Sequence, residues 1–208
     1  MSNNKYNRAA NEASSIVFNA WKEGFEQGKL RVRVDTSYQY KDVCFDIDAN
    51  IVFKKGLNRL NIDGGAGYDA DLEDEDFIQV RFEVDPNLIP DYWEEVSMNL
   101  KDLFRHEIEH LVHGEGWNSV PSRMMEDDAA IRKMINTRLL PRVEYFKLEK
   151  EVDANIQGMY FRAKKEKVKF ARVVNNYLNS QKITVAEKKD IIALWKSRSL
   201  QLGIKSLI

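Results

Sequence analysis

Two histidines with a glutamate between them form the group in this chain that most strongly suggests chemistry. The segment His106-Glu107-Ile108-Glu109-His110 has the pattern His-Glu-x-x-His. On a helix, positions i and i+4 lie on one face about one turn apart, so His106 and His110 could hold one metal ion. Glu107, one position further round the helix, could take a proton from a water molecule that the metal activates. The pattern therefore predicts a mononuclear Zn²⁺ site with Glu107 as the base.

The distribution of histidine favours this interpretation. The chain has three histidines, and all of them fall within residues 106–113. The alternative is a surface helix that carries two unrelated histidines. The third, His113, would lie on nearly the same face as His106 but about 10 Å further along the axis, so one zinc could not take both. His113 could donate a hydrogen bond to a developing oxyanion, or it could be a histidine at the rim of the site.

The residues around the motif predict a helix over 91–113. Apolar residues recur there at helical spacing: Trp93, Val96, Leu100, Leu103 and Leu111. Asp91 with Glu94 is a plausible capping box, and Gly114 supplies a stop. Asp102 lies one turn before His106 and could accept the second N–H of that ring, or it could be an exposed helix residue.

A catalytic zinc keeps three protein ligands and one open position, so the chain must supply a ligand beyond the histidine pair. The best candidate is Glu151, on a second strongly periodic helix, at the edge of the apolar stripe near Leu148 and Val152. A carboxylate there would be costly to bury alone, and a cation would neutralise it. Glu149 is a rival, but it lies about 200° round the helix from Glu151, so only one of the two can face a metal.

Composition sets the class of protein. At 208 residues, with 43% hydrophobic and 31% charged residues, the chain is expected to be one soluble globular domain, or one domain with an appendage. A net charge of −1 gives no reason to expect a nucleic acid or an anionic membrane as partner. The single cysteine, Cys44, forms no intramolecular disulfide, which favours a reducing compartment. We see no signal peptide and no membrane-spanning run, and expect a cytoplasmic protein.

The periodicity predicts an α+β fold. A helix is expected over 6–27, and from residue 30 to 84 the hydrophobic period changes to two. The expected strands are 30–35, 43–48, 51–53, 60–62 and 78–84. They predict a small, mostly antiparallel sheet, because the links are too short for helical crossovers. The glycines at 64–67 and the acidic run at 69–76 are interpreted as a solvated, mobile loop rather than a phosphate or calcium site.

The remainder of the chain is predicted to be helical. The expected helices after the motif helix are 122–137, 141–165, 168–178 and a last one that Thr184 caps with Glu187. The predicted order is therefore an N-terminal helix, a small sheet, the motif helix, the glutamate-bearing helix and C-terminal helices. We expect a first domain over 1–165 and a helical extension over 166–208 packed on it.

His106-Glu107-x-x-His110 followed by Glu151-x-x-Ala154-Asn155 resembles the gluzincin branch of zinc metallopeptidases, and the order of elements resembles its minimal members. The resemblance implies a zincin-like fold and a zinc-dependent endopeptidase. It implies that His106, His110 and Glu151 hold the zinc and that Glu107 is the base. It also implies that Asn155 orients the ligands, which favours Glu151 over Glu149.

A wider stretch carries a second resemblance. The residues from Tyr145-Phe146 to Ala154, followed by Gly158, Tyr160 and Ala163-Lys164-Lys165, resemble predicted metallopeptidases of tailed phages. The Ala-Asn ending is similar to peptidases of mobile elements that cleave repressors, although these usually have a glycine where this chain has Glu109. The resemblance implies a protein or peptide substrate in the cytoplasm of a bacterium or phage-infected host. Tyr145 could stabilise an oxyanion, or it could be a core residue.

The predicted activity is hydrolysis of peptide bonds. The strand at 78–84, if it forms a sheet edge, could bind the substrate as an added strand.

Three alternatives to this activity stay open. A zinc amidohydrolase of the deformylase type is one alternative, because the motif followed by Leu111 looks like the one in that family. That family also needs a cysteine ligand in a Glu-Gly-Cys-Leu context, whereas Cys44 lies in Val-Cys-Phe. The others are an inactive zincin-fold binding module and a structural protein without metal.

Overall fold

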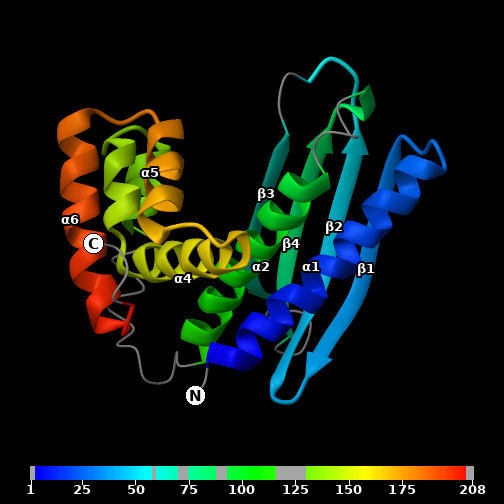
Figure 1. Cartoon of the computed structure of the whole chain (residues 1–208), viewed down its shortest axis with the longest axis horizontal. Coiled ribbons are helices and arrows are strands. Elements are labelled where there is room, and N and C mark those ends of the chain that lie inside the picture. Colours follow the sequence, from blue (N-terminus) through cyan, green and yellow to red (C-terminus); the bar gives the residue numbers. More distant parts are fainter. Residues whose placement is uncertain (1–2, 58–59, 70–74, 88–92, 116–129, 205–208) are drawn as a thin grey trace. The chain divides into compact units, whose positions relative to one another are not determined.

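The computed structural model describes residues 3–57, 60–69, 75–87, 93–115 and 130–204, and it divides the chain into two compact units, Met1–Leu111 and Val112–Ile208 (Figure 1). The fold class is α+β, as predicted: an N-terminal helix, a four-stranded sheet and then helices. The predicted division into 1–165 and 166–208 stays a prediction. Each unit is described by itself.

The first unit begins with helix α1 (Asn3–Glu26), which the periodicity predicted over 6–27. Residues at helical spacing on one face are fully buried: Ala10, Ala13, Val17 and Trp21. Gly28, just past the end of the helix, has a φ of 65°, a left-handed conformation that glycine adopts without steric penalty.

Four strands follow and form one sheet. They are β1 (Arg31–Tyr40), β2 (Val43–Phe53), β3 (Asn61–Asp69) and β4 (Glu75–Val84), in the order β1-β2-β4-β3. The β1–β2 and β3–β4 pairs are antiparallel, and β2–β4 is parallel. The sheet is therefore mixed, because strand β3 serves as the crossover between two parallel strands. The strands expected at 43–48 and 51–53 are one continuous strand.

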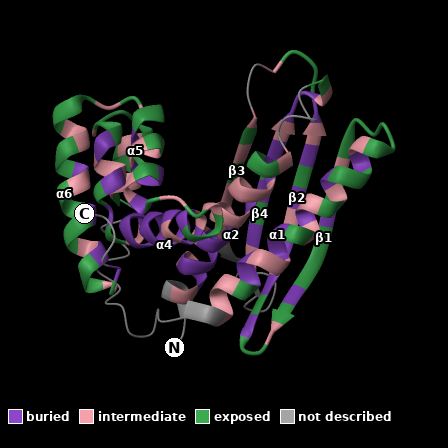
Figure 2. Cartoon of the chain, in the orientation of Figure 1, coloured by how far each residue is buried: buried purple, intermediate pink, exposed green. Residues whose placement is uncertain are grey.

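One face of the sheet is apolar and the other faces solvent. Figure 2 shows that buried residues are frequent along β2. Burial alternates strictly along this strand, and its buried side chains are Val43, Phe45, Ile47, Ala49, Ile51 and Phe53. Helices α1 and α2 (Trp93–Glu115) cover this face (Figure 1). The ring of Trp21 lies 5.4 Å from that of Phe82 on β4 and 4.8 Å from that of Trp93 on α2, measured between centroids. The period-two pattern thus builds the surface against which the motif helix packs.

One prediction for this region is wrong, and the condition attached to another is not met. The glycines at 64–67 lie within strand β3 rather than in a loop. At Gly64 a Cβ would stand 2.8 Å from the main-chain oxygen of Gln79 and 3.0 Å from the side chain of Leu103 on α2, so the strand needs glycine where the helix packs closely on it. Strand β4 lies between β2 and β3, so its residues 78–84 are not a sheet edge. The acidic residues 70–74 lie outside the described part of the chain, and the loop expected there is untested.

All the regular elements described in the second unit are helices. It contains a helical stretch at 130–136, the 3₁₀ helix η3 (Arg142–Lys147), and helices α4 (Glu149–Glu166), α5 (Phe170–Ser180) and α6 (Val185–Gln201). The helix expected over 141–165 is interrupted at Leu148, whose backbone is extended. Residues 122–129 of the helix expected at 122–137 lie outside the described part. Thr184 and Glu187 form the predicted capping box of α6.

The second unit has its own hydrophobic core. It is built from apolar side chains of η3, α4, α5 and α6, among them Phe146, Ile156, Val174, Leu178 and Trp195. Trp195 is fully buried and its indole N–H donates to the main-chain oxygen of Phe146 over 2.9 Å. Among the described helices none is both long enough and apolar enough to cross a membrane.

Candidate metal centre

Helix α2 presents the two histidines of the motif on a face of their own. Its buried stripe packs on the sheet and consists of Val96, Leu100, Phe104, Ile108 and Leu111. At 100° per residue, the mean direction of His106 and His110 lies about 120° round the helix from the mean direction of that stripe. Both histidines are half-buried. The apolar stripe therefore holds the helix on the sheet while leaving the imidazoles accessible to a ligand.

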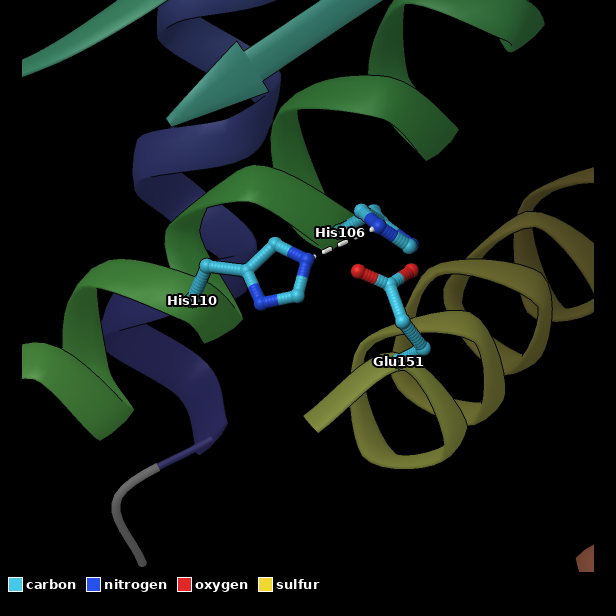
Figure 3. A group of neighbouring side chains, drawn as sticks. All are labelled: His106, His110 and Glu151. Carbon is cyan, nitrogen blue, oxygen red and sulfur yellow. Dashed lines mark hydrogen bonds between the residues drawn. The ribbon is translucent and has the colours of Figure 1, made fainter. Parts of the chain in front are cut away.

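The two imidazoles converge on one point. Their Nε2 atoms are 3.1 Å apart, and the ring centroids are separated by 4.8 Å with the planes at 81° (Figure 3). Two nitrogens bound tetrahedrally to one zinc at 2.0–2.1 Å would stand about 3.3 Å apart. A hydrogen bond between two neutral rings would also bring the atoms to this distance, with the donor set by the tautomer. The spacing is therefore close to the one that two nitrogens sharing an ion would have.

Glu107 lies beside the histidine pair. Its carboxylate is buried, and Oε1 stands 4.0 Å from Nε2 of His106. A group at that distance is within reach of a water molecule that occupies the space next to the ring nitrogen. The first unit alone therefore holds two converging nitrogen donors and a carboxylate placed to exchange a proton.

Glu151 lies in the first turn of α4 in the second unit, and its side chain is only 1% exposed. The guanidinium of Arg132 donates to its Oε1 and forms an ion pair with it. The phenol of Tyr145, on η3, has its pKa raised by burial first and then by the charge of Glu151 and a hydrogen bond to it. Arg132 also lies over the Tyr145 ring, 5.6 Å from its centroid. A buried carboxylate is thus held in one place by a cation and a phenol.

Sequence reasoning did not single out Arg132. No periodicity or spacing relates Arg132 to Glu151, because the two meet only through the packing of the second unit.

Glu149 and Glu151, the two candidates for the third metal ligand, differ in burial and in the charges next to them. The side chain of Glu149 is 54% exposed and lies 3.4 Å from the guanidinium of Arg198. That arginine also makes two 2.6 Å bonds to the buried Asp153. Glu149 therefore faces α6 and lies against Arg198. Glu151 remains the better candidate for a metal ligand.

The remaining residues of the predicted site are placed but not tested. The Asn155 amide is buried and donates to the main-chain oxygen of Glu151 over 2.7 Å, which is a bond within α4. Asp102 is half-buried on α2, and its role toward His106 stays a prediction. His113 belongs to α2, but its side chain lies outside the described part of the structure.

Three of the described side chains form a group that could hold a metal ion: His106, His110 and Glu151 (Figure 3). Each offers one ligand atom. Two imidazoles and one carboxylate are a donor set that metal ions such as zinc accept. The histidines belong to the first unit and Glu151 to the second.

Compared with known proteins, the chain matches no family model, no curated protein and no solved structure. The class that the fold and the site define is therefore an α+β protein with a possible metal site of two histidines and one glutamate.

Proposed function

We propose that this protein is a zinc-dependent metallopeptidase in which His106, His110 and Glu151 hold the ion and Glu107 is the general base. The observation that carries the proposal is the 3.1 Å approach of the two Nε2 atoms, with the Glu107 carboxylate 4.0 Å from one of them. A structural zinc site is closed by its protein ligands and needs no base. Two converging histidines with a buried carboxylate beside them favour a catalytic site.

The roles of the residues follow from their chemistry. The imidazoles and the Glu151 carboxylate would bind the ion, with Arg132 and Tyr145 holding that carboxylate in place. A bound zinc supplies Lewis-acid polarisation of a carbonyl and makes a nearby water molecule more acidic. Glu107 would take a proton from that water as it attacks the carbonyl carbon. The same carboxyl group would then pass the proton to the amine that leaves when the C–N bond breaks.

Strand β3 is the element that we propose as the cradle for an extended substrate. It is an edge of the sheet, with β4 on one side. Leu103 of α2, one turn before His106, packs against it at Gly64. A peptide that paired with the outer edge of β3 would gain main-chain hydrogen bonds close to the motif helix. This replaces the assignment of that role to residues 78–84.

The nature of the substrate is proposed from the family resemblance. Gluzincins act on proteins or peptides, and the 145–165 stretch resembles predicted metallopeptidases of tailed phages. We therefore propose a protein substrate in the cytoplasm of a bacterium or phage-infected host. The chemistry of the site suits any amide, but an edge strand favours an extended chain over a small amide.

The test combines metal analysis with substrate profiling. We expect about one zinc per chain in the purified wild type. In a host lysate, wild-type protein should generate new peptide termini, and Glu107→Gln should reduce their rate of formation by about 10²–10⁴-fold, the usual contribution of a general base. The variant should keep its zinc. Cleavage that persists unchanged in Glu107→Gln would contradict the assignment of the base.

The other candidate functions are separated by the same measurements. An inactive binding module would hold zinc and show no cleavage in either protein. A structural protein would hold no zinc. A deformylase-type enzyme would need a cysteine ligand, but Cys44 lies exposed in β2 opposite Gln39 and is not part of the group formed by His106, His110 and Glu151.

A further inference from the structure

A buried ion pair lies next to the two histidines on helix α2. Arg105 is fully buried, and its Nη1 donates to Oε2 of Glu109 over 2.6 Å. The Nε–H of Arg105 donates to Oδ1 of Asn7 on α1 over 3.1 Å. The guanidinium also stands 5.9 Å from the ring centroid of Tyr6. One guanidinium thus connects two turns of α2 to the beginning of α1.

The spacing of this pair repeats the spacing of the histidines. Arg105 and Glu109 are at i and i+4, and each directly precedes one of the histidines, His106 and His110. The ion pair therefore lies about 100° round the helix from the imidazole pair. Any rotation of α2 that moved the guanidinium away from Asn7 would turn both imidazoles by the same angle.

Burial of such a pair is poorly explained by stability alone. Two charges lose their hydration when they enter the interior, and apolar side chains of similar volume often stabilise a core as well or better. A buried ion pair instead fixes the orientation of the helix that carries it. The apolar stripe of α2 can tolerate small rotations and shifts, whereas a hydrogen-bonded guanidinium is satisfied in one orientation only.

We infer that Arg105 and Glu109 are positioning residues for the metal centre, and that the first turns of α1 act through Asn7 as a clamp on the rotation of the motif helix. The inference rests on the proposed zinc site and adds residues that touch neither the ion nor the substrate. It also assigns a role to Glu109, where peptidases of the repressor-cleaving type usually have glycine.

The experiment measures zinc affinity and the unfolding temperature of the zinc-free protein. The double variant Arg105→Met/Glu109→Leu replaces the pair with apolar groups of similar volume. We expect its unfolding temperature to stay close to that of the wild type while its zinc affinity falls about 10–100-fold, the usual effect of losing a group that orients a ligand. The control is Arg162→Met/Glu166→Leu, which removes a 2.6 Å pair of the same spacing on α4 and should leave zinc affinity unchanged.

A second comparison decides the question if the double variant fails to fold. Asn7→Asp keeps an oxygen acceptor for the Arg105 guanidinium, and Asn7→Leu removes it. We expect Asn7→Asp to bind zinc as the wild type does and Asn7→Leu to bind it about tenfold more weakly or worse. Zinc bound by the wild type and, within twofold, by Asn7→Leu would overturn this inference alone. Absence of zinc from the wild type would overturn the proposed function, and this inference with it.

Discussion

Leu103 of α2 packs directly on Gly64 of β3, and both of its δ-carbons come within 3.0 Å of the position that a Cβ at residue 64 would occupy. Leu103 lies one turn before His106. The backbone of β3 is therefore in contact with the part of the helix that bears the first histidine. The missing side chain at Gly64 is what permits this approach.

We predict that Gly64→Ala destabilises the first unit and weakens zinc binding. The added methyl would meet the main-chain oxygen of Gln79 and the Leu103 side chain, and overpacking of this kind costs about 1–3 kcal/mol. Gly65→Ala is the control, because a Cβ there has no described atom within 4 Å. Urea denaturation measures the difference. Equal stability of the two variants would show that α2 can move away from β3 without penalty.

The choice of the third ligand gives a second prediction. Glu151→Ala should reduce zinc affinity by several orders of magnitude, because it removes the only carboxylate of the group. Glu149→Ala should bind zinc as the wild type does, since that side chain is largely exposed and lies against Arg198. Isothermal titration calorimetry of the two variants provides the measurement. The reverse result would assign the ligand to Glu149.

Removal of the metal is predicted to lower thermal stability. An ion that binds only the folded protein stabilises it by about 2.7 kcal/mol when its free concentration is 100 times the dissociation constant. A chelator should therefore lower the unfolding temperature of the wild type by several degrees, and added zinc should restore it. Glu151→Ala should respond much less to the chelator. Loss of bound zinc with no change in the unfolding temperature would place the ion outside the folded core.

A fourth prediction concerns pH and the contact between α1 and β1. The Tyr38 phenol donates to Glu12 over 2.7 Å, and this bond, followed by one from Arg8, holds the pKa of Glu12 below its usual value of 4.5. A carboxyl group whose pKa is lower in the folded than in the unfolded protein stabilises the fold at pH values above its unfolded-state pKa. This stabilisation is lost as the pH falls through the folded-state pKa.

Glu12→Gln should therefore be less stable than the wild type at pH 7, and the difference should shrink as the pH falls below about 4.5. Denaturant midpoints at pH 7 and pH 3 test this. Glu26→Gln is the matched control on the same helix, because Glu26 is exposed and lies 3.9 Å from Lys22. A difference for Glu12→Gln that stays constant between the two pH values would show that the charge of Glu12 is not responsible.

Patterns within short segments were enough to predict several features of this protein. The helical spacing around His106 and His110, the alternation of apolar residues in β2 and the Thr184–Glu187 capping box are all found where they were expected. Each depends on residues that are near one another along the chain. Their geometry follows from the period of a helix or strand and from local hydrogen bonds.

The strand order depended on contacts that no local pattern contains. Short links predicted a mostly antiparallel sheet, and the pairs β1–β2 and β3–β4 are antiparallel as expected. The parallel pairing of β2 with β4 was not predicted, and it arises because β3 returns along the far side of β4. The glycines at 64–67 suggested a loop. They lie in strand β3, paired with β4, and α2 packs closely on Gly64. Only the tertiary structure determines where such an approach occurs.

Sequence alone thus determined which side chains could do chemistry: two histidines one turn apart, a glutamate next to the first, and Glu151 on a later helix. The tertiary structure decided how these groups are held. Arg105 meets Asn7, and Arg132 meets Glu151, across long stretches of chain. Periodicity predicts which residues are buried, but a buried polar group finds its partner only when distant segments pack, because that packing determines which donors and acceptors meet.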